Sequence, residues 1–261
     1  MIGIFDSGMG GLTVLADAMK LLPKESFVYY GDFENAPYGI KTKKEVLKLS
    51  ENICEILIDQ YNVKAIVIAC NTATSAAVTS LRKKYSVPII GMEPAVKPAI
   101  QFNKGKQIAV MATEMTLKEQ KFNQLINRFE NRNKIIKVPC SPLVEKIETV
   151  DFDQMSLEQI INKCIPTIDS IESIVLGCTH FVFIKDYLRE KYNDQIRVFD
   201  GNRGTIKNLT NRLIKNNLNN TADHPQEILI IGSGKEEKIE LSKKIFNKYC
   251  KGRVIWMMLF N

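Results

Sequence analysis

Two cysteines of the sequence stand in closely similar surroundings. Cys70 ends the run IVIAC and Cys178 ends the run IVLGC, and each is followed by two polar residues, NT and TH. Both runs have the composition of a buried strand that ends in a small residue and leads into a helix. Surrounding groups can bring the pKa of a thiol, about 8.5 when unperturbed, close to neutrality. The repeated pattern therefore predicts proton transfer by a pair of thiols.

The polar residues that follow the cysteines are suited to binding a substrate or passing a proton. Asn71, Thr72 and Thr179 carry amide and hydroxyl groups that bond a carboxylate or an ammonium group. His180, one of two histidines, and Asp6 can take up or release a proton. Helix capping is the alternative role for such residues. Their repeated position next to a cysteine favours the functional role.

The first apolar run leads into a glycine-rich segment, SGMGG at residues 7–11. Such a turn can hold a dinucleotide, with Asp32 placed to bond the ribose. However, Thr13 stands where that motif has its third glycine, and Asp6 would bring negative charge to the pyrophosphate. We expect instead that the glycines allow the backbone to approach a small ligand, with Asp6 and Ser7 in the site.

Two further segments contribute candidate residues. Tyr38 and Gly39 follow a proline and are candidates for substrate binding, with an ordinary turn as the alternative. The segment CSPLVE at residues 140–145 places a polar turn after an apolar run. Glu145 at the end of this segment is therefore a candidate carboxylate near the site. The alternative is that Glu145 is a solvated glutamate on a helix face.

Short apolar runs and amphipathic segments alternate along the chain, which is typical of an α/β protein with mainly parallel sheets. About ten expected strands exceed one small sheet, so we expect two α/β lobes. We expect one lobe, with Cys70, to span residues 1–94 and 205–261, and the other, with Cys178, to span 95–204. One predicted helix covers 117–130. In parallel sheets functional residues lie beyond the carboxyl ends of strands, where both cysteines are expected.

Composition excludes several functional classes. The 261 residues include no apolar stretch of the roughly 18 to 20 residues that a membrane helix needs, and no secretory signal, so we expect a cytoplasmic protein. The net charge of +7 comes from dispersed, mainly Lys cations, which argues against nucleic acid and suits an anionic metabolite. The cysteine spacings match no metal site. We expect the other cysteines to be plain packing residues: Cys54, Cys140, Cys164 and Cys250.

Together these motifs resemble those of the glutamate racemases, and the resemblance runs through most of the chain. It rests on several segments in the same order: IFDSGMGGLTV at 4–14, GD at 31–32, PYG at 37–39, ACNTAT at 69–74, EP at 93–94, PLVE at 142–145 and LGCTH at 176–180. Several motifs in the right order are more specific than any one of them.

The resemblance implies two α/β lobes related by a pseudo-twofold axis, a site in the cleft between them, and a homodimer. It implies cofactor-independent interconversion of L- and D-glutamate, which supplies D-glutamate for peptidoglycan. Cys70 and Cys178 would be the acid/base pair, with Asp6 assisting Cys70, and Glu145 and His180 assisting Cys178. The implied substrate-binding residues are Asp6, Ser7, Tyr38, Gly39, Asn71, Thr72, Thr179 and His180.

The sequence departs from the family pattern at 181–182, 201–202, Met115 and Glu119, while both cysteines are present. These departures leave two alternatives open. One is a related racemase acting on aspartate or another amino acid. The other is a binding or regulatory protein that has kept the fold, which loss of either cysteine would favour.

Overall fold

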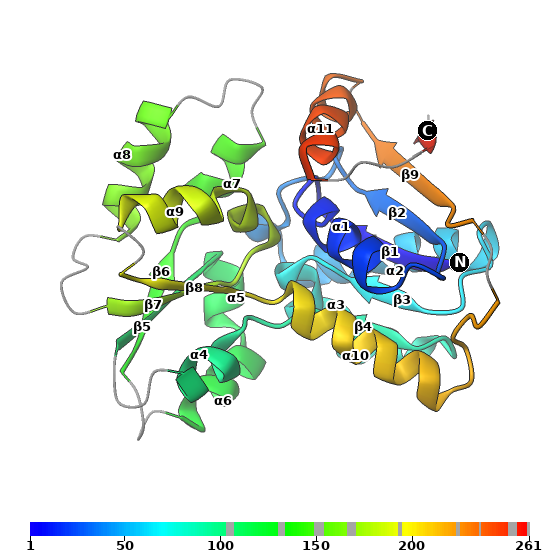
Figure 1. The fold of residues 1–261 in the computed structure, drawn as a ribbon, viewed down its shortest axis with the longest axis horizontal. Coiled ribbons are helices and arrows are strands. Elements are labelled where there is room, and N and C mark those ends of the chain that lie inside the picture. Colours follow the sequence, from blue (N-terminus) through cyan, green and yellow to red (C-terminus); the bar gives the residue numbers. More distant parts are fainter. Residues whose placement is uncertain are drawn as a thin grey trace. The chain divides into compact units, whose positions relative to one another are not determined.

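The structure, a computed structural model, describes residues 1–102, 107–129, 134–148, 154–165, 171–192, 195–222, 225–234, 236–249 and 255–259. His224 and Cys250 lie outside these ranges. Contacts between Cα atoms divide the chain into two units, Met1–Met92 with Asn202–Asn261, and Glu93–Gly201. The sequence analysis expected the chain to pass between the units after residues 94 and 204, which is two and three residues later than the structure shows. Figure 1 shows the elements of each unit.

The first unit is built on a six-stranded sheet in the order β10-β9-β2-β1-β3-β4, in which every strand pair is parallel. Its strands are β1 (Ile2–Asp6), β2 (Phe27–Gly31), β3 (Ile66–Ile68), β4 (Ile89–Gly91), β9 (Ile228–Ser233) and β10 (Ile255–Leu259). The chain leaves β1 at Asp6 and β3 shortly before Cys70. Because β1 and β3 are parallel neighbours, both departures lie at the same edge of the sheet.

Helices cover both faces of this sheet, and all residues of β1, β2 and β3 are buried. The helices are α1 (Leu12–Leu21), a 3-10 turn η1 (Tyr38–Ile40), α2 (Lys43–Asp59), α3 (Asn71–Lys84), α10 (Asn202–Lys215) and α11 (Glu236–Tyr249). α2 packs against α3, and α1 packs against α10 and α11. Strands buried on both faces explain why this part of the sequence reads as continuous apolar runs.

The second unit contains a parallel four-stranded sheet in the order β6-β5-β7-β8. Its strands are β5 (Gln107–Ala112), β6 (Ile135–Pro139), β7 (Ile171–Leu176) and β8 (Arg197–Asp200). Its helices are α4 (Val96–Phe102), α5 (Glu114–Lys118), α6 (Gln120–Asn127), α7 (Ser141–Ile147), α8 (Gln154–Cys164), the 3-10 helix η2 (Thr179–Ile184) and α9 (Lys185–Lys191).

Alternate residues of β5 face two separate apolar clusters. Ala109 and Met111 join the cluster that includes residues of α7, α8, η2 and α9. Ile108 and Val110 join the cluster that includes residues of α4, α5 and α6. This period of two is the alternation of side chains along a strand. The second sheet is therefore covered on both faces, and Cys178 belongs to the α7 and α8 side.

The helix predicted at 117–130 is interrupted. α5 ends at Lys118 and α6 begins at Gln120, because Glu119 adopts an extended backbone conformation with φ −63° and ψ 135°. The side-chain amide of Asn123 donates to the carbonyl oxygens of Leu117, Lys118 and Glu119, at 3.3, 3.3 and 3.0 Å. These bonds give partners to the carbonyl groups of Leu117 and Lys118 at the end of α5, while the carbonyl of Glu119 also accepts the backbone N–H of Asn123 at 3.1 Å.

The α/β class with two parallel sheets is confirmed. No helix within the described ranges combines the length and the apolar character needed to cross a membrane.

Candidate functional site

Cys70 is held at the start of α3. It is the N-cap residue of that helix, with an extended backbone, and its sulfur accepts a hydrogen bond from the N–H of Ala73 at 3.3 Å. The side chain is only 5% exposed. Unpaired N–H groups and the positive end of a helix favour negative charge on a group placed there. The thiol therefore occupies a position in which a thiolate is stabilised.

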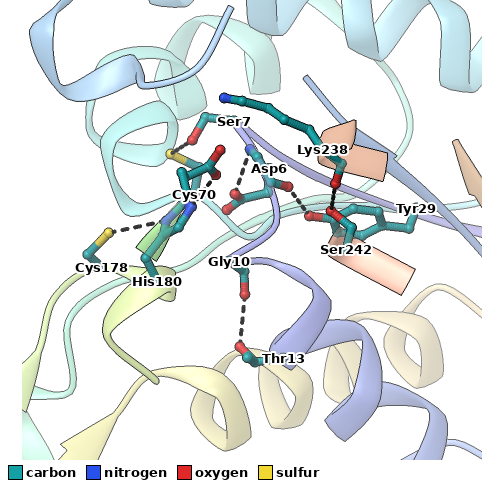
Figure 2. Close-up of polar contacts among 12 residues, drawn as sticks. Asp6, Ser7, Gly10, Thr13, Tyr29, Cys70, Cys178, His180, Lys238 and Ser242 are labelled. Atoms are coloured by element: carbon teal, nitrogen blue, oxygen red, sulfur yellow. Dashed lines mark hydrogen bonds and ion pairs between the residues drawn. The ribbon is translucent and has the colours of Figure 1, made fainter. Parts of the chain in front are cut away.

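Residues at the end of β1 complete the surroundings of Cys70. The hydroxyl of Ser7 donates to the sulfur of Cys70 at 3.6 Å, as Figure 2 shows. Asp6 is fully buried, and its carboxylate accepts a hydrogen bond from the N–H of Gly8 at 2.9 Å. The register of parallel β1 and β3 brings these residues together although they are more than sixty positions apart. We call Asp6, Ser7, Cys70 and Asn71 the Cys70 cluster.

Tyr38 is fixed by a buried carboxylate that the sequence did not connect with it. Its hydroxyl donates to Asp32 at 2.6 Å, and burial followed by the Asp32 charge raises the pKa of Tyr38, so the phenol keeps its proton. Asp32 also accepts hydrogen bonds from Asn35 and Ser233, each at 3.0 Å. Both oxygens of Asp32 are thus bonded within the protein, which disfavours the ribose-binding role considered above.

Three further residues that the sequence predicted for the site, Gly39, Asn71 and Thr72, lie next to Tyr38 or close to Cys70 in the chain. Thr72 lies in the first turn of α3 and is buried, and Gly39 in η1 is half-buried. Asn71 is buried at 3% exposure, and neither polar atom of its side chain has a hydrogen-bond partner. A buried amide normally has partners. Asn71 therefore offers a donor and an acceptor to a ligand.

Cys178 follows β7 and a glycine that the packing requires. A Cβ atom on Gly177 would lie 2.9 Å from the carbonyl oxygen of Met111 and 2.9 Å from the Cβ of Ala112, both on β5. Backbone atoms in a sheet cannot move aside, so only glycine allows this close approach. The next residue, Cys178, is 8% exposed and precedes η2. Thr179, the first residue of η2, is also buried.

A histidine and a glutamate form a chain of contacts with Cys178. The sulfur lies 3.7 Å from Nδ1 of His180, and Nε2 of His180 lies 2.6 Å from a carboxylate oxygen of Glu148 (Figure 2 shows the first contact). His180 and Glu148 are both buried. Burial alone would lower the pKa of His180, but the hydrogen bonds and charges of Cys178 and Glu148 raise it well above the usual value. We call Cys178, His180 and Glu148 the Cys178 cluster.

Glu148 is the functional candidate that the sequence reasoning missed. It follows α7 and is buried, whereas Glu145 on the same helix is exposed. Helical spacing contained the signal, because Val144 and Ile147 are buried and Glu148 lies four residues after Val144. The PLVE motif drew attention to Glu145, one turn earlier.

The other described cysteines lie apart from these contacts. Cys54 is buried in α2, Cys140 is fully buried before α7, and Cys164 is half-buried at the end of α8. Within the described residues, no group of three or more His, Cys, Asp or Glu side chains is placed to hold a metal ion.

The structural class is therefore defined by two sheets of parallel strands, each covered by helices and each followed by a buried cysteine at a strand end. The family model described as Asp/Glu/hydantoin racemase matches residues 13–209, and the chain belongs to this family of isomerases. A relative from Clostridium novyi, named glutamate racemase, is 48% identical over 94% of this chain and 96% of its own length.

Solved structures agree with this assignment. The glutamate racemase of Escherichia coli, in complex with L-glutamate and an activator, matches with a TM-score of 0.85 and 27% identity, over 99% of this chain and 97% of its own. The glutamate racemase of Francisella tularensis, in complex with D-glutamate, matches with a TM-score of 0.83 and 26% identity, over 99% and 97%.

The raised pKa of His180 predicts a pH-dependent contribution to stability. A pKa above the value of about 6.5 in the unfolded chain means that His180 stabilises the fold fully below that pH. This contribution is lost as the pH rises through the folded-state pKa. We expect the difference in unfolding free energy between the parent and His180→Gln to shrink from pH 6 towards alkaline pH in urea titrations. A difference that grows with pH would contradict the shift.

Proposed function

We propose that this chain is a glutamate racemase that interconverts L- and D-glutamate without a cofactor, with Cys70 and Cys178 as its two bases. The observation that carries the proposal is the pair of buried strand-end thiols, each with its own charge-stabilising neighbours. The choice of glutamate draws on the relatives, which carry that name, and on the two related enzymes solved with L- and D-glutamate.

In the proposed reaction one cysteine is a thiolate and the other a thiol. The thiolate takes the α-proton from one face of the substrate, and the electron pair of the C–H bond stays on the α-carbon. The thiol then delivers its proton to the opposite face. After one turnover the two cysteines have exchanged protonation states, and the same enzyme form runs the reverse reaction. No redox change and no other reactant are needed.

The protein has to stabilise charge at two stages. Before reaction the thiolate needs hydrogen-bond donors, which Ala73 and Ser7 provide at Cys70 and protonated His180 provides at Cys178. During reaction the α-carbon becomes carbanion-like, and hydrogen bonds to the substrate carboxylate stabilise it. Asn71, whose amide has no partner, is the first candidate for such a bond, and the resemblance adds hydroxyls of Thr72 and Thr179.

Asp6 and Glu148 have different proposed roles. Asp6 lies at the end of β1 beside the Ser7 that bonds Cys70, and we assign it to proton transfer on that side. Glu148 acts through His180, whose charged form it stabilises, and is a positioning residue. Ser7, Tyr38 and Gly39 complete the proposed substrate-binding set. We further propose a cytoplasmic homodimer whose D-glutamate supplies peptidoglycan.

Exchange of the substrate α-hydrogen in deuterated water tests the proposed activity. We expect D- and L-glutamate to gain deuterium, and D- and L-aspartate to gain it far more slowly, measured by mass spectrometry. Cys70→Ser and Cys178→Ser should each abolish racemization while the circular dichroism spectrum is retained. Absence of exchange for all four amino acids would exclude a racemase, and a parental rate in either variant would exclude the two-base assignment.

The variants Glu148→Gln and Glu145→Gln test which of two glutamates assists Cys178. Glu145 lies within α7, and Glu148 directly follows it. Because Glu148 contacts His180, its loss should lower kcat by about tenfold or more with little change in KM, since general acid–base groups contribute on the order of 100-fold or more. The alkaline limb of the pH–rate profile should move to lower pH, because His180 loses a partner that raises its pKa. A comparable loss in Glu145→Gln alone would instead support the assignment by motif.

Asn71→Leu tests substrate binding separately from folding. The side chain of Asn71 has no partner to lose, so the unfolding free energy should stay constant or rise. A lost hydrogen bond to a charged substrate, about 1.5–3 kcal/mol, should lower kcat/KM by about tenfold or more. In the matched variant Asn35→Leu, loss of the bond to Asp32 should lower stability by about 1 kcal/mol. An unchanged kcat/KM in Asn71→Leu would remove Asn71 from the site.

A further inference from the structure

Tyr29 of β2 binds the turn that follows β1. Its hydroxyl donates a hydrogen bond to the carbonyl oxygen of Gly8 at 2.6 Å (Figure 2). Both residues are buried, and Tyr29 has no exposed surface. A buried carbonyl group needs a hydrogen-bond donor, and here a side chain from the neighbouring strand supplies it. The bond therefore fixes the turn at Gly8.

The register of the sheet explains why Tyr29 reaches this carbonyl group. Gly31 pairs with Asp6, the last residue of β1, and lies two residues after Tyr29. Because side chains alternate along a strand, positions 29 and 31 share one face of β2. A Cβ atom on Gly31 would lie 3.1 Å from the carbonyl oxygen of Gly8. The turn thus lies against this face of β2, and the hydroxyl of Tyr29 meets it from two residues earlier.

The ring of Tyr29 also packs against the end of the same turn. A Cβ atom on Gly11 would lie 3.0 Å from the ring carbon Cε2 of Tyr29 and 2.6 Å from the Cβ of Asp6. It would also lie 3.0 Å from the Cβ of Ala69, the residue before Cys70. Only glycine fits at this point, because the surrounding side chains leave no room for another carbon. Tyr29 therefore holds the turn at two places, through its hydroxyl and through its ring.

Ser7 lies between two residues whose positions are fixed. The carboxylate of Asp6 accepts a hydrogen bond from the N–H of Gly8 at 2.9 Å, and the carbonyl group of Gly8 is held by Tyr29. Ser7 itself donates to the sulfur of Cys70 at 3.6 Å. A hydrogen bond weakens when its donor moves away or out of line. The bond from Ser7 to Cys70 therefore depends on the anchor that Tyr29 provides.

We propose that Tyr29 is a positioning residue of the Cys70 cluster, which aims the hydroxyl of Ser7 at the sulfur of Cys70 by holding the carbonyl group of Gly8. Where it concerns activity, this inference rests on the proposed function. The alternative is that Tyr29 is a core residue whose hydroxyl contributes to stability alone. The two roles differ in their effect on Cys70, because only positioning changes how strongly a thiolate is stabilised there.

Tyr29→Phe tests the inference because it removes the hydroxyl and keeps the ring that packs against the turn. Tyr85→Phe is the matched control, since the hydroxyl of Tyr85 also donates to a backbone carbonyl group, that of Glu51, at 3.2 Å. Tyr85 follows the fourteen residues of α3, which places it roughly 20 Å from Cys70 at the other end of that helix. Both variants should unfold at a lower urea concentration than the parent, because each loses one hydrogen bond.

The pH dependence of Cys70 alkylation measures the effect without substrate. Each protein is treated with iodoacetamide over a pH series, and the peptide that contains Cys70 is quantified by mass spectrometry. The midpoint reports ionisation of the thiol, whereas altered access changes the rate at every pH. In Tyr29→Phe the midpoint should move to higher pH by about half a unit or more, because the thiolate loses a well-aligned donor. Tyr85→Phe should keep the parental midpoint, and an equal shift there would overturn the inference.

A double-mutant cycle tests whether Tyr29 acts through Ser7. Ser7→Ala removes the donor itself and should move the midpoint at least as far as Tyr29→Phe. The variant with both changes should match Ser7→Ala, because no hydroxyl is left to be aimed. Replacement of Tyr29 by 4-aminophenylalanine, whose amine can donate to the carbonyl group of Gly8, should move the midpoint back towards the parental value. Additive shifts in the double variant, or a parental midpoint in Tyr29→Phe, would overturn the inference.

Activity measurements separate this inference from the proposed function. Tyr29→Phe should lower kcat/KM for glutamate racemization by about tenfold, less than the roughly hundredfold loss that a misplacement of 1 Å can cause. Tyr85→Phe should racemize glutamate at the parental rate. A protein that shows the shift at Cys70 but never racemizes glutamate would contradict only the proposed function. An unchanged midpoint in a Tyr29→Phe variant that racemizes normally would contradict only the positioning role of Tyr29.

Discussion

Burial of the two strand-end thiols is the constraint on which the rest of the site depends. Cys70 and Cys178 are each more than nine-tenths buried, and burial disfavours a negative charge unless donors lie within contact distance. The two units meet this need in different ways. Cys70 receives a backbone N–H and the hydroxyl of Ser7. Cys178 receives an imidazole, which in turn needs the carboxylate of Glu148.

The difference follows from the helices that begin at each cysteine. α3 runs for fourteen residues and offers a full α-helical start, with Cys70 as its cap. η2 is a six-residue 3-10 helix, and the sulfur of Cys178 accepts no capping hydrogen bond from it. The helix dipole acts through aligned peptide groups, which a short 3-10 helix supplies poorly. A protonated His180 provides in the second unit the positive charge that a helix start provides in the first.

The sequence predicted the parts of this arrangement that depend on local pattern. The apolar runs before Cys70 and Cys178 specified parallel strands, and the polar residues after them specified helix starts. Glu148 was not predicted, because its role depends on which face of α7 is buried, and the neighbouring motif pointed to Glu145. The contact of Asp32 with Tyr38 and the break at Glu119 were likewise missed. Ser233 helps to hold Asp32, and Asn123 bonds the carbonyl groups at the break. Neither contact forms before the chain has folded.

The described cysteines show how surroundings divide one residue type into several chemical classes. Cys54 lies in an apolar helix interface, where burial keeps its proton in place. Cys140 is fully buried before α7, whereas Cys164 at the end of α8 is half-buried. Cys70 and Cys178 instead face donors from other residue types, so their charge is stabilised without a second sulfur within bonding contact. A thiol that must give and take a proton repeatedly is safest where its stabilising partners cannot form a covalent bond with it.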